Sequence, residues 1–448
     1  MNKNITLIKN GFVVNEQQIS NTDILIEGPY IKRISPKISE IPEDTKVIDA
    51  TGKYVFPGVI DDQVHFREPG LTHKATIETE SKAAIAGGIT SFIEMPNTKP
   101  QTTTLENLNE KFRIASETSF ANYSFMFGGT NDNLDAILSV DPHKVAGLKL
   151  FLGSSTGNML VDDIAVLEQI FKSTDLLISV HCEDEDTIKQ NLKRFKAEFG
   201  DDIPIKCHPL IRSEEACYIS SSRAIALAQK TGARLHVFHL STGKETTLFT
   251  NKIPLKDKKI TSEVCIHHLW FTDDDYETKG THIKWNPAVK TEKDRLELWE
   301  ALLDDRIDVI ATDHAPHTLD EKNNNYTKAP SGGPLVQHAL PAMLDMYHKG
   351  KISLEKIAEK MCHNPAILFQ IEKRGFIKEN YFADIVIADL DAPWEVNKNN
   401  TLYKCKWSPF EDHTFQSRIT QTLVNGHVVY DNGIFHRDKY AKQLTFNR

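Results

Sequence analysis

Residues 59–70 read VIDDQVHFREPG, a short apolar run that ends in metal-capable and charged side chains before a Pro-Gly turn. Seven further apolar runs follow along the chain, and each precedes a segment long enough for a helix. They are ITSFIEM (89–95), NYSFMFG (122–128), VAGLKLF (145–151), LLISVHC (176–182), ARLHVFH (233–239), KKITSEV (258–264) and DVIATDH (308–314). Eight β/α units in about 300 residues predict an α/β fold, a (β/α)₈ barrel.

The two ends of the chain instead contain short alternating strands separated by Gly, Asn and Pro turns. Examples are ITLIKNGFVV (5–14) and TKVIDATGKYVF (45–56) at one end, and ADIVIADLD (383–391) and HVVYDNGIF (427–435) at the other. We expect residues 1–56 and 373–448 to form one composite β domain and residues 57–372 to form the barrel. The polar stretch DEKNNNYTKAPSGG (320–333) is typical of a mobile loop.

The composition of the chain argues against nucleic-acid and membrane partners. The chain has 448 residues, with 53 Lys and Arg against 62 Asp and Glu, for a formal net charge of −9. An acidic balance argues against nucleic-acid binding, and no apolar run is long enough to span a bilayer. The amino terminus has no signal-peptide pattern, and the six cysteines show no paired CxxC spacing. We therefore expect a cytoplasmic protein with reduced thiols and a small-molecule substrate.

Metal-capable side chains gather at the carboxyl ends of the predicted strands, where the active site of such a barrel is built. They are His65, Lys149, His181, His239 and Asp313. Imidazoles with one carboxylate suit Zn²⁺ or a similar cation and leave a position open for water, which favours hydrolysis. Lys149 leaves two alternatives, because an ammonium repels a metal. The side chain either reaches solvent or reacts with CO₂ to give a carbamate.

Several strings give the chain a resemblance to a known family. They include FPGVIDDQVHFREPG, FIEMPNT, SVHCEDED, RLHVFHLSTG, WNPAVKT and IDVIATDHAPHT, and the resemblance runs through nearly all of the sequence. The chain resembles the cyclic amidohydrolases of the amidohydrolase superfamily, most closely class I dihydroorotases. This resemblance implies a distorted (β/α)₈ barrel with a small β-sandwich made from both termini. It also implies reversible cyclisation of N-carbamoyl-L-aspartate to L-dihydroorotate in pyrimidine biosynthesis.

The resemblance further implies a metal centre with one or two Zn²⁺ ions. His65 and Asp313 would bind the first metal, and His181 and His239 the second. Lys149, as its carbamate, would bridge the two. Asp313 would also move the proton between water and the leaving ring nitrogen. Many class I enzymes have Asp where Lys149 stands, whereas hydantoinases and allantoinases use the lysine.

A second implied set of residues binds the substrate. Arg67, Asn97 and His317 would hold its free carboxylate, and a guanidinium fork matches a planar carboxylate. Asn286 would hydrogen-bond the ring, and the backbone at Ser331 and Gly332 would cover it.

The first metal motif departs from the family, because Gln63 stands where a histidine is expected. Three interpretations are open: Gln63 is a weak ligand, Gln63 only hydrogen-bonds a water, or the first metal is absent. We favour the second, since three other first-site ligands are present. Gln337 replaces a usual Glu and is expected to adjust a loop. Cys182, His267 and His268 are expected to pack near the site without taking part, and His314 to orient Asp313.

Two alternative functions are open. An allantoinase or dihydropyrimidinase would share the metal set but would not need Arg67 and Asn97 for a carboxylate. A catalytically impaired homologue could serve as a structural subunit, for instance of aspartate carbamoyltransferase. The resemblance also predicts a homodimer and a possible association with that carbamoyltransferase.

Overall fold

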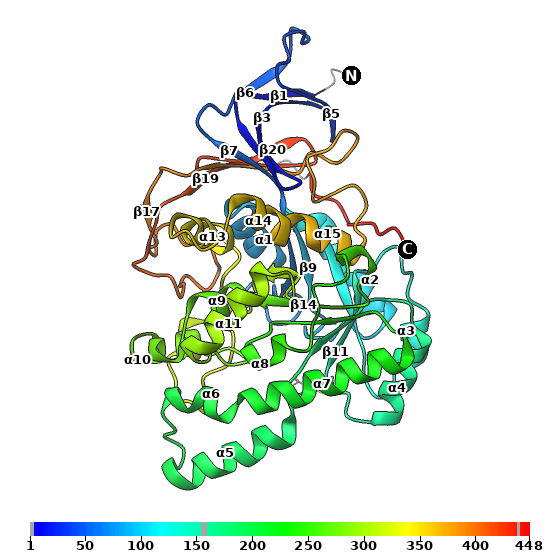
Figure 1. The fold of residues 1–448 in the computed structure, drawn as a ribbon, viewed down its shortest axis with the longest axis vertical. Helices are drawn as coiled ribbons and strands as arrows, with labels where there is room; N and C mark the ends of the chain where they lie inside the picture. Colours follow the sequence, from blue (N-terminus) through cyan, green and yellow to red (C-terminus); the bar gives the residue numbers. More distant parts are fainter. Residues whose placement is uncertain (1–3, 154–158, 437–439) are drawn as a thin grey trace.

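The computed structural model describes residues 4–153, 159–436 and 440–448, which form a barrel and a β-sandwich (Figure 1). The sandwich lies at the top of the view and the barrel below it, with helices α5 (Glu185–Phe199) and α7 (Glu214–Thr231) at the far end. Residues 154–158, the end of the GLKLFLGSSTGNM motif around Lys149, lie outside the described residues.

Eight parallel strands form the barrel in sequential order, as the apolar runs predict. Every residue of β9 and β10 is buried, which is typical of parallel strands covered on both faces. The strands are β8 (Val59–Val64), β9 (Ile89–Glu94), β10 (Asn122–Gly128), β11 (Gly147–Phe151), β12 (Ile178–His181), β13 (Leu235–Val237), β14 (Ile260–Cys265) and β15 (Val309–Ala311).

The barrel is distorted where its first and last strands meet. The register between β8 and β9 shifts twice, between Val59 and Ile60 and between Asp61 and Val64. Closure comes beyond the end of β15, where the backbone N–H of His65 donates to the carbonyl of His314 at 2.7 Å. The irregular stretch of β8 therefore contains Gln63 and leads directly into the site.

Side-chain caps define where the barrel helices begin. Thr76, Thr104 and Ser213 accept hydrogen bonds from backbone N–H groups of α1 (Ile77–Ala86), α2 (Leu105–Thr118) and α7. No helix among the described residues is long and apolar enough to cross a membrane. The other helices are α3 (Leu134–Leu138), α4 (Ile164–Ser173), α6 (His208–Ile211), α8 (Gly243–Thr246), α9 (Ile266–Trp270), α10 (Tyr276–Lys279), α11 (Glu292–Leu303), α12 (Leu319–Lys322), α13 (Ala339–His348), α14 (Leu354–Ala358) and α15 (Asn364–Phe369).

The sandwich combines both ends of the chain, as expected. A four-stranded sheet of order β5-β4-β1-β6 comes from the amino-terminal end alone, and a seven-stranded sheet of order β21-β20-β19-β16-β7-β2-β3 comes from both. Ile8, Ile24, Val55 and Ile385 belong to the apolar core between them. The strands are β1 (Ile5–Lys9), β2 (Phe12–Asn15), β3 (Gln18–Asn21), β4 (Asp23–Glu27), β5 (Tyr30–Ser35), β6 (Lys46–Asp49), β7 (Tyr54–Pro57), β16 (Ile385–Asp389), β19 (Arg418–Val424), β20 (His427–Asp431) and β21 (Ile434–Phe435), and a separate pair is β17 (Trp394–Glu395) with β18 (Thr414–Phe415).

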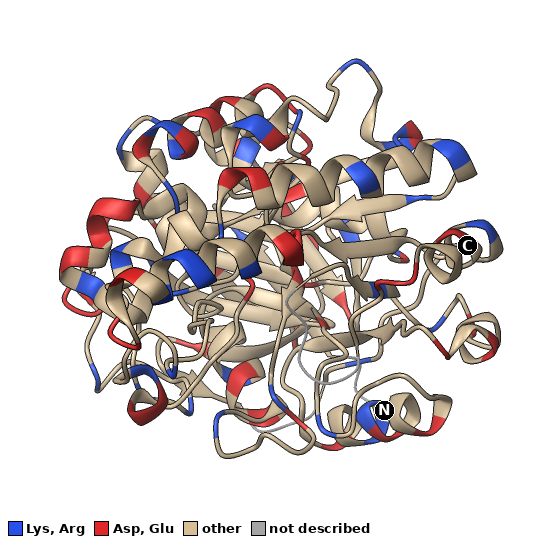
Figure 2. Ribbon diagram, turned by 90° about the horizontal axis from the view of Figure 1, so that it is seen from below, with Lys and Arg blue, Asp and Glu red and all other residues tan. Residues whose placement is uncertain are grey.

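Two parts of the carboxyl-terminal region return to the barrel. Residues 440–448 run down its side, where Leu444 and Tyr123 share a backbone hydrogen bond of 2.9 Å. Earlier in the same region, the indole N–H of Trp407 donates to the carbonyl of His317 at 2.8 Å. Figure 2 shows acidic and basic residues mixed along the helices on the side that it presents.

Candidate active site

His65, Asp313 and Asn97 form the first group of predicted site residues that the structure brings together. The Nε2 atom of His65 lies 3.2 Å from Oδ1 of Asp313, and its Nδ1 atom lies 2.7 Å from Oδ1 of Asn97. Burial is the largest influence on His65 and lowers the pKa of its ring, which favours the neutral form. If Nδ1–H donates to Asn97, then Nε2 presents a lone pair to a carboxylate oxygen. Two acceptors that face each other need a proton or a cation between them.

His181 and His239 form the second group. Nδ1 of His181 lies 2.9 Å from Nε2 of His239, and the rings meet edge to face. Nε2 of His181 lies 3.0 Å from a carboxylate oxygen of Glu183, which also pairs with Arg212. Burial opposes ionisation of Glu183, but Arg212 and His181 outweigh it and lower its pKa to about 2. A carboxylate behind an imidazole is the usual support of a metal-binding histidine.

Lys149 is buried in the barrel wall between these groups and aromatic side chains. Its Nζ lies 4.1 Å from the ring centroid of Phe238 and 4.9 Å from that of Phe151. Burial lowers the pKa of Lys149 to about 7, although Glu263 and Asp313 act in the opposite direction. A neutral amine is the form that reacts with CO₂, so this environment is compatible with a carbamate. The predicted solvent-exposed alternative does not fit a side chain that is 1% exposed.

Gln63 is buried and faces the end of β14. The thiol of Cys265 lies 3.7 Å from Oε1 of Gln63 and 3.8 Å from a carboxylate oxygen of Glu263. The amide oxygen is thus beside a sulfur atom. Which of the three interpretations of Gln63 holds stays a prediction.

Arg67, His317 and Ser331 form a polar group next to His65. Nε of Arg67 donates to the carbonyl of Pro316 at 3.0 Å. Nε2 of His317 lies 3.0 Å from both a terminal nitrogen of Arg67 and the carbonyl of Ser331. Burial is the main cause that lowers the pKa of His317 well below its usual value, so the ring is neutral. One neutral ring nitrogen cannot both accept from Arg67 and donate to Ser331, so one of these partners is available to a ligand.

The segment 320–333, expected to be a mobile loop, is fastened to the barrel. Nζ of Lys322 is buried and donates to the carbonyls of Pro330 and Gly332 at 2.9 and 2.8 Å. The backbone N–H of Gly332 donates to the carbonyl of Lys284. The φ angle of Gly332 is +124°, a conformation that favours glycine. Composition does not reveal that a lysine is buried under this backbone, so these hydrogen bonds could not be expected, and the mobility of the segment stays a prediction. Nearby, Oδ1 of Asn286 is buried with no hydrogen-bond partner among the described residues.

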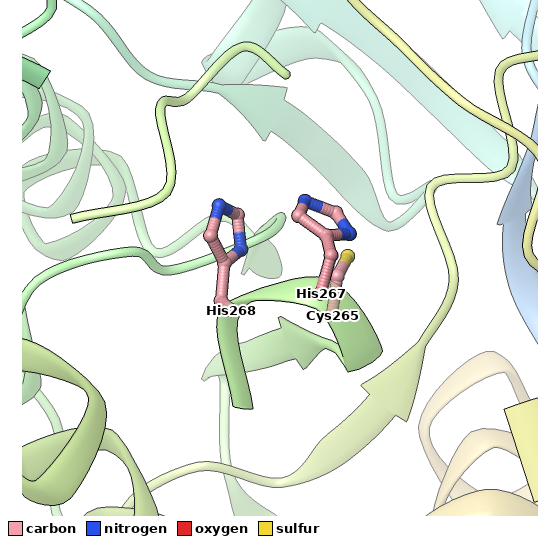
Figure 3. A group of neighbouring side chains, drawn as sticks. All are labelled: Cys265, His267 and His268. Atoms are coloured by element: carbon pink, nitrogen blue, oxygen red, sulfur yellow. The ribbon is translucent and has the colours of Figure 1, made fainter. Parts of the chain in front are cut away.

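His267 and His268 follow Cys265 at the end of β14 and lie close together, as Figure 3 shows. The ring of His267 stacks on Trp285 with centroids 4.3 Å apart and an angle of 14°. This stacking agrees with the packing expected for His267. Together with Cys265, the two histidines form one of two buried groups in the described residues whose ligand atoms all lie within 4.8 Å of one another.

The other such group is Asp62, His236 and Glu263, which lies inside the barrel. Nε2 of His236 is 3.2 Å from Glu263 and 3.5 Å from Asp62. Burial favours a neutral ring, but the hydrogen bonds to Asp62 and Glu263 outweigh it and raise the pKa of His236 to about 9. Two acidic side chains and an imidazolium thus share a site without solvent contact.

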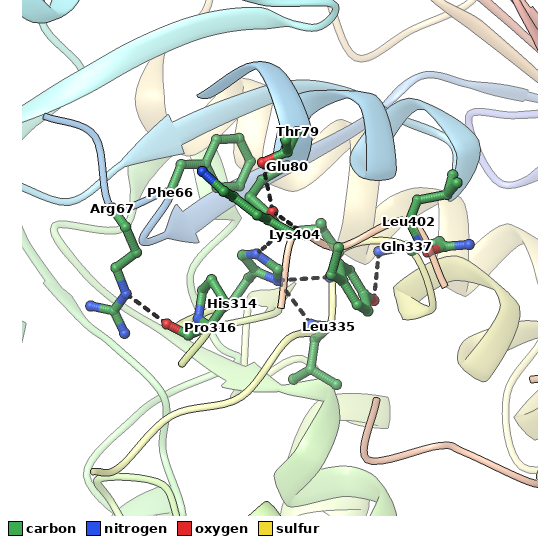
Figure 4. Close-up of polar contacts among 12 residues, drawn as sticks. Phe66, Arg67, Thr79, Glu80, His314, Pro316, Leu335, Gln337, Leu402 and Lys404 are labelled. Atoms are coloured by element: carbon green, nitrogen blue, oxygen red, sulfur yellow. Dashed lines mark hydrogen bonds and ion pairs between the residues drawn. The ribbon is translucent and has the colours of Figure 1, made fainter. Parts of the chain in front are cut away.

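His314 and Gln337 connect the site to the carboxyl-terminal region (Figure 4). Nε2 of His314 lies 2.9 Å from Glu80, and its Nδ1 accepts from the backbone N–H of Leu335 at 2.9 Å. Both ring nitrogens are therefore occupied by protein groups. Gln337 accepts from the backbone N–H of Leu402 at 2.8 Å, which agrees with the expected adjustment of a loop.

Sequence reasoning missed several residues that support the site. Lys74 donates toward Nδ1 of His317 at 2.9 Å and pairs with Glu321 at 2.9 Å. Glu80 holds His314, and Glu183 holds His181. Glu183 follows His181 closely in the string HCEDED, which was the available signal for this residue.

The arrangement fits a metal centre on its own chemistry. His65 faces Asp313 through two acceptor atoms, and His181 and His239 converge through their ring nitrogens. Nδ1 of His239 is buried without a hydrogen-bond partner among the described residues. Imidazole and carboxylate donors with supporting second partners suit a zinc-class cation.

Comparisons with known proteins agree with the fold. The model of the Amidohydrolase family matches residues 54–429. A protein named dihydroorotase from Halobacterium salinarum is 34% identical over 91% of this chain and 93% of its own length. A protein named allantoinase from Desulfitobacterium hafniense is 32% identical over 98% of each chain. The structure of an L-hydantoinase (dihydropyrimidinase) from Arthrobacter aurescens is 30% identical and superposes with a TM-score of 0.93, over 98% of this chain and 99% of that one.

The family match and these similarities cover most of the chain and agree in the kind of chemistry that they name. The polar groups at the carboxyl ends of the barrel strands are those that such chemistry needs. The chain belongs to the amidohydrolase family and is a hydrolase that acts on a cyclic amide.

Proposed function

We propose that this hydrolase is a dihydroorotase, which interconverts N-carbamoyl-L-aspartate and L-dihydroorotate in pyrimidine biosynthesis. One observation carries the proposal: a buried guanidinium, Arg67, lies beside the His65–Asp313 pair, and no carboxylate among the described residues forms an ion pair with it. A buried cation without a protein counter-ion favours an anionic ligand. Both proposed substrates carry a carboxylate that the reaction leaves unchanged, on a ring carbon of L-dihydroorotate and on the α-carbon of N-carbamoyl-L-aspartate.

Arg67 and His317 suit a carboxylate that arrives from solvent. A bound carboxylate accepts from the terminal nitrogens of Arg67, which leaves Nε2 of His317 free to donate to Ser331. Burial lowers the pKa of Arg67 to about 10, and it stays charged at neutral pH. Lys74, at 2.9 Å from His317, is a second cation on the same side, but it is paired with Glu321 at 2.9 Å. The charge of Arg67 thus attracts an anion although the whole chain is acidic.

The chemistry follows from the groups around the ring. Zinc, when held by His65, Asp313, His181, His239 and a carboxylated Lys149, would act as a Lewis acid on water and on the ring carbonyl. Asp313 would take a proton from the attacking water and give it to the leaving ring nitrogen. Oδ1 of Asn286 offers an acceptor to a ring N–H group. The steps reverse in the biosynthetic direction.

Allantoinase is the second candidate. Relatives named dihydroorotase and allantoinase match at 34% and 32% identity, so overall similarity does not separate the two activities. Lys149 also favours the hydantoinase and allantoinase pattern. Because Gln63 stands where a histidine ligand is expected, a catalytically impaired homologue with a structural role is the third outcome. Zinc as the metal, a homodimer, a cytoplasmic location and association with an aspartate carbamoyltransferase belong to the proposal as well.

The test is an assay of the zinc-loaded full chain with bicarbonate in both directions, with allantoin as a parallel substrate. The proposal predicts interconversion of dihydroorotate and carbamoyl aspartate, and loss of at least about 100-fold in kcat for Asp313→Asn. Turnover of allantoin alone would favour the second candidate. No turnover of either compound would favour the structural homologue.

A further inference from the structure

A single turn presents three metal-capable side chains that the proposed hydrolytic chemistry does not use. Strand β14 ends at Cys265, and α9 begins at the next residue, so His267 and His268 project from its first turn. The ligand atoms of these three residues lie within 4.8 Å of one another, and Figure 3 shows the side chains gathered there. Cys265 and His267 are fully buried, and His268 is 3% exposed.

Both ring nitrogens of His267 and Nδ1 of His268 have no hydrogen-bond partner among the described residues, although buried polar atoms normally have one. Nε2 of His268 lies 3.2 Å from the carbonyl of Pro287. This carbonyl assigns the ring proton to Nε2 and leaves Nδ1 of His268 as a buried lone pair with no partner among the described residues. One side of His267 lies toward the backbone of Thr312, but neither ring nitrogen completes a hydrogen bond there. A buried polar atom without a partner is unfavourable unless a ligand satisfies it.

The surroundings hold these donors in position. Trp285 stacks on the ring of His267 at 4.3 Å, and Pro287 fixes the ring of His268. A carbonyl that accepts from the second nitrogen of an imidazole is a common support for a metal ligand. Oε1 of Gln63, 3.7 Å from the sulfur of Cys265, is a further neutral oxygen donor at the edge of the group.

The donor chemistry identifies the class of ion. One sulfur and two imidazole nitrogens suit zinc and related d-block cations, and do not suit Mg²⁺ or Ca²⁺, which prefer oxygen. We propose that Cys265, His267 and His268 bind a zinc-class cation, separate from the metal held by the His65–Asp313 and His181–His239 pairs. Binding releases the thiol proton to solvent and forms a metal–sulfur bond. The proposal does not depend on which cyclic amide the enzyme hydrolyses.

Sulfur makes this site spectroscopically separable, because the other proposed ligands are nitrogen and oxygen atoms. The experiment replaces the metals of the full-length protein with Co²⁺ in the absence of oxygen and records the thiolate-to-cobalt absorption in the near ultraviolet. The wild type is expected to show this band. Cys265→Ser is expected to lose the band together with one bound cobalt per chain. Cys362→Ser is the matched control, because Cys362 is also buried but donates to the carbonyl of Pro57 at 3.3 Å.

A second variant covers the case in which Cys265→Ser does not fold. His268→Gln keeps the sulfur but removes a nitrogen donor, and it is expected to weaken the band-forming cobalt site by more than about 10-fold in a chelator competition. A wild-type protein that binds cobalt without the thiolate band would overturn the proposal. Loss of the band in Cys362→Ser with retention in Cys265→Ser would also overturn it.

Discussion

Arg67, His239 and Asp313 adopt left-handed backbone conformations, with φ values of 67°, 41° and 47°. Such conformations are uncommon outside glycine and cost free energy that other contacts must offset. Each of the three residues stands just beyond the end of a barrel strand. The uncommon backbone conformations thus occur at the strand ends, where the candidate site is formed.

Arg67 provides the most direct residue-scale prediction. Arg67→Lys keeps one positive charge but removes the planar pair of donors that matches a carboxylate. We expect KM for L-dihydroorotate to rise about 10-fold to 100-fold, with a smaller change in kcat, in steady-state assays. Arg113→Lys, on the exposed face of α2, is the control that should change neither value. An unchanged KM in Arg67→Lys would remove the carboxylate-binding role.

Gln63 provides a prediction about metal retention. An amide oxygen binds zinc more weakly than an imidazole does, so the wild type should lose its first-site metal before its second-site metal. Gln63→His should bring the two losses closer together in a chelator titration followed by metal analysis. The variant should retain first-site metal about 10-fold better. Near-equal loss of both metals from the wild type would contradict this expectation.

The barrel strands could be predicted from the sequence because parallel strands are buried on both faces and so appear as continuous apolar runs. The anchoring of loops and the partners of the site residues were less predictable than the strands. The anchoring of segment 320–333 depends on Lys322, whose burial beneath Lys284 and Gly332 is a tertiary effect. His65, Arg67 and His317 could be placed at strand ends in advance. Two supporting residues, Glu80 beside His314 and Lys74 beside His317, come from other parts of the chain and could not.

The anchored segment gives a prediction at the scale of an element. Lys322→Met should leave the carbonyls of Pro330 and Gly332 without their donor and loosen residues 320–333. Hydrogen exchange in this segment should become at least about 10-fold faster, in line with the loss of buried hydrogen bonds. Lys328→Met changes an exposed lysine of the same segment and should have no such effect. Equal exchange in the two variants would argue against the anchor.

At the scale of the whole molecule, the last residues of the chain pack against the barrel. Leu444 and Phe446 are buried, whereas Thr445 between them is exposed. The sequence predicted a β domain made from both termini, because strand-like segments recur at both ends. It did not predict that the last residues leave that domain, since a pair of apolar residues at alternating positions does not identify the surface that it will cover.

This return gives a prediction about global stability. Phe446→Ala should lower the free energy of unfolding by about 3–5 kcal/mol, measured by urea denaturation, because it empties a buried position. Thr445→Ala should change it by less than about 1 kcal/mol. Equal effects of the two substitutions would show that the chain end does not contribute through burial.

The central claim is that a buried Arg67 beside the metal-capable pairs selects a ring that carries a carboxylate. The most direct measurement compares kcat/KM of the zinc-loaded wild type for L-dihydroorotate and for dihydrouracil, which has the same ring without the carboxylate. A charged hydrogen-bonding contact contributes about 1.5–3 kcal/mol, so we predict a preference for dihydroorotate of at least about 10-fold. Equal values, or a preference for dihydrouracil, would contradict the proposed function.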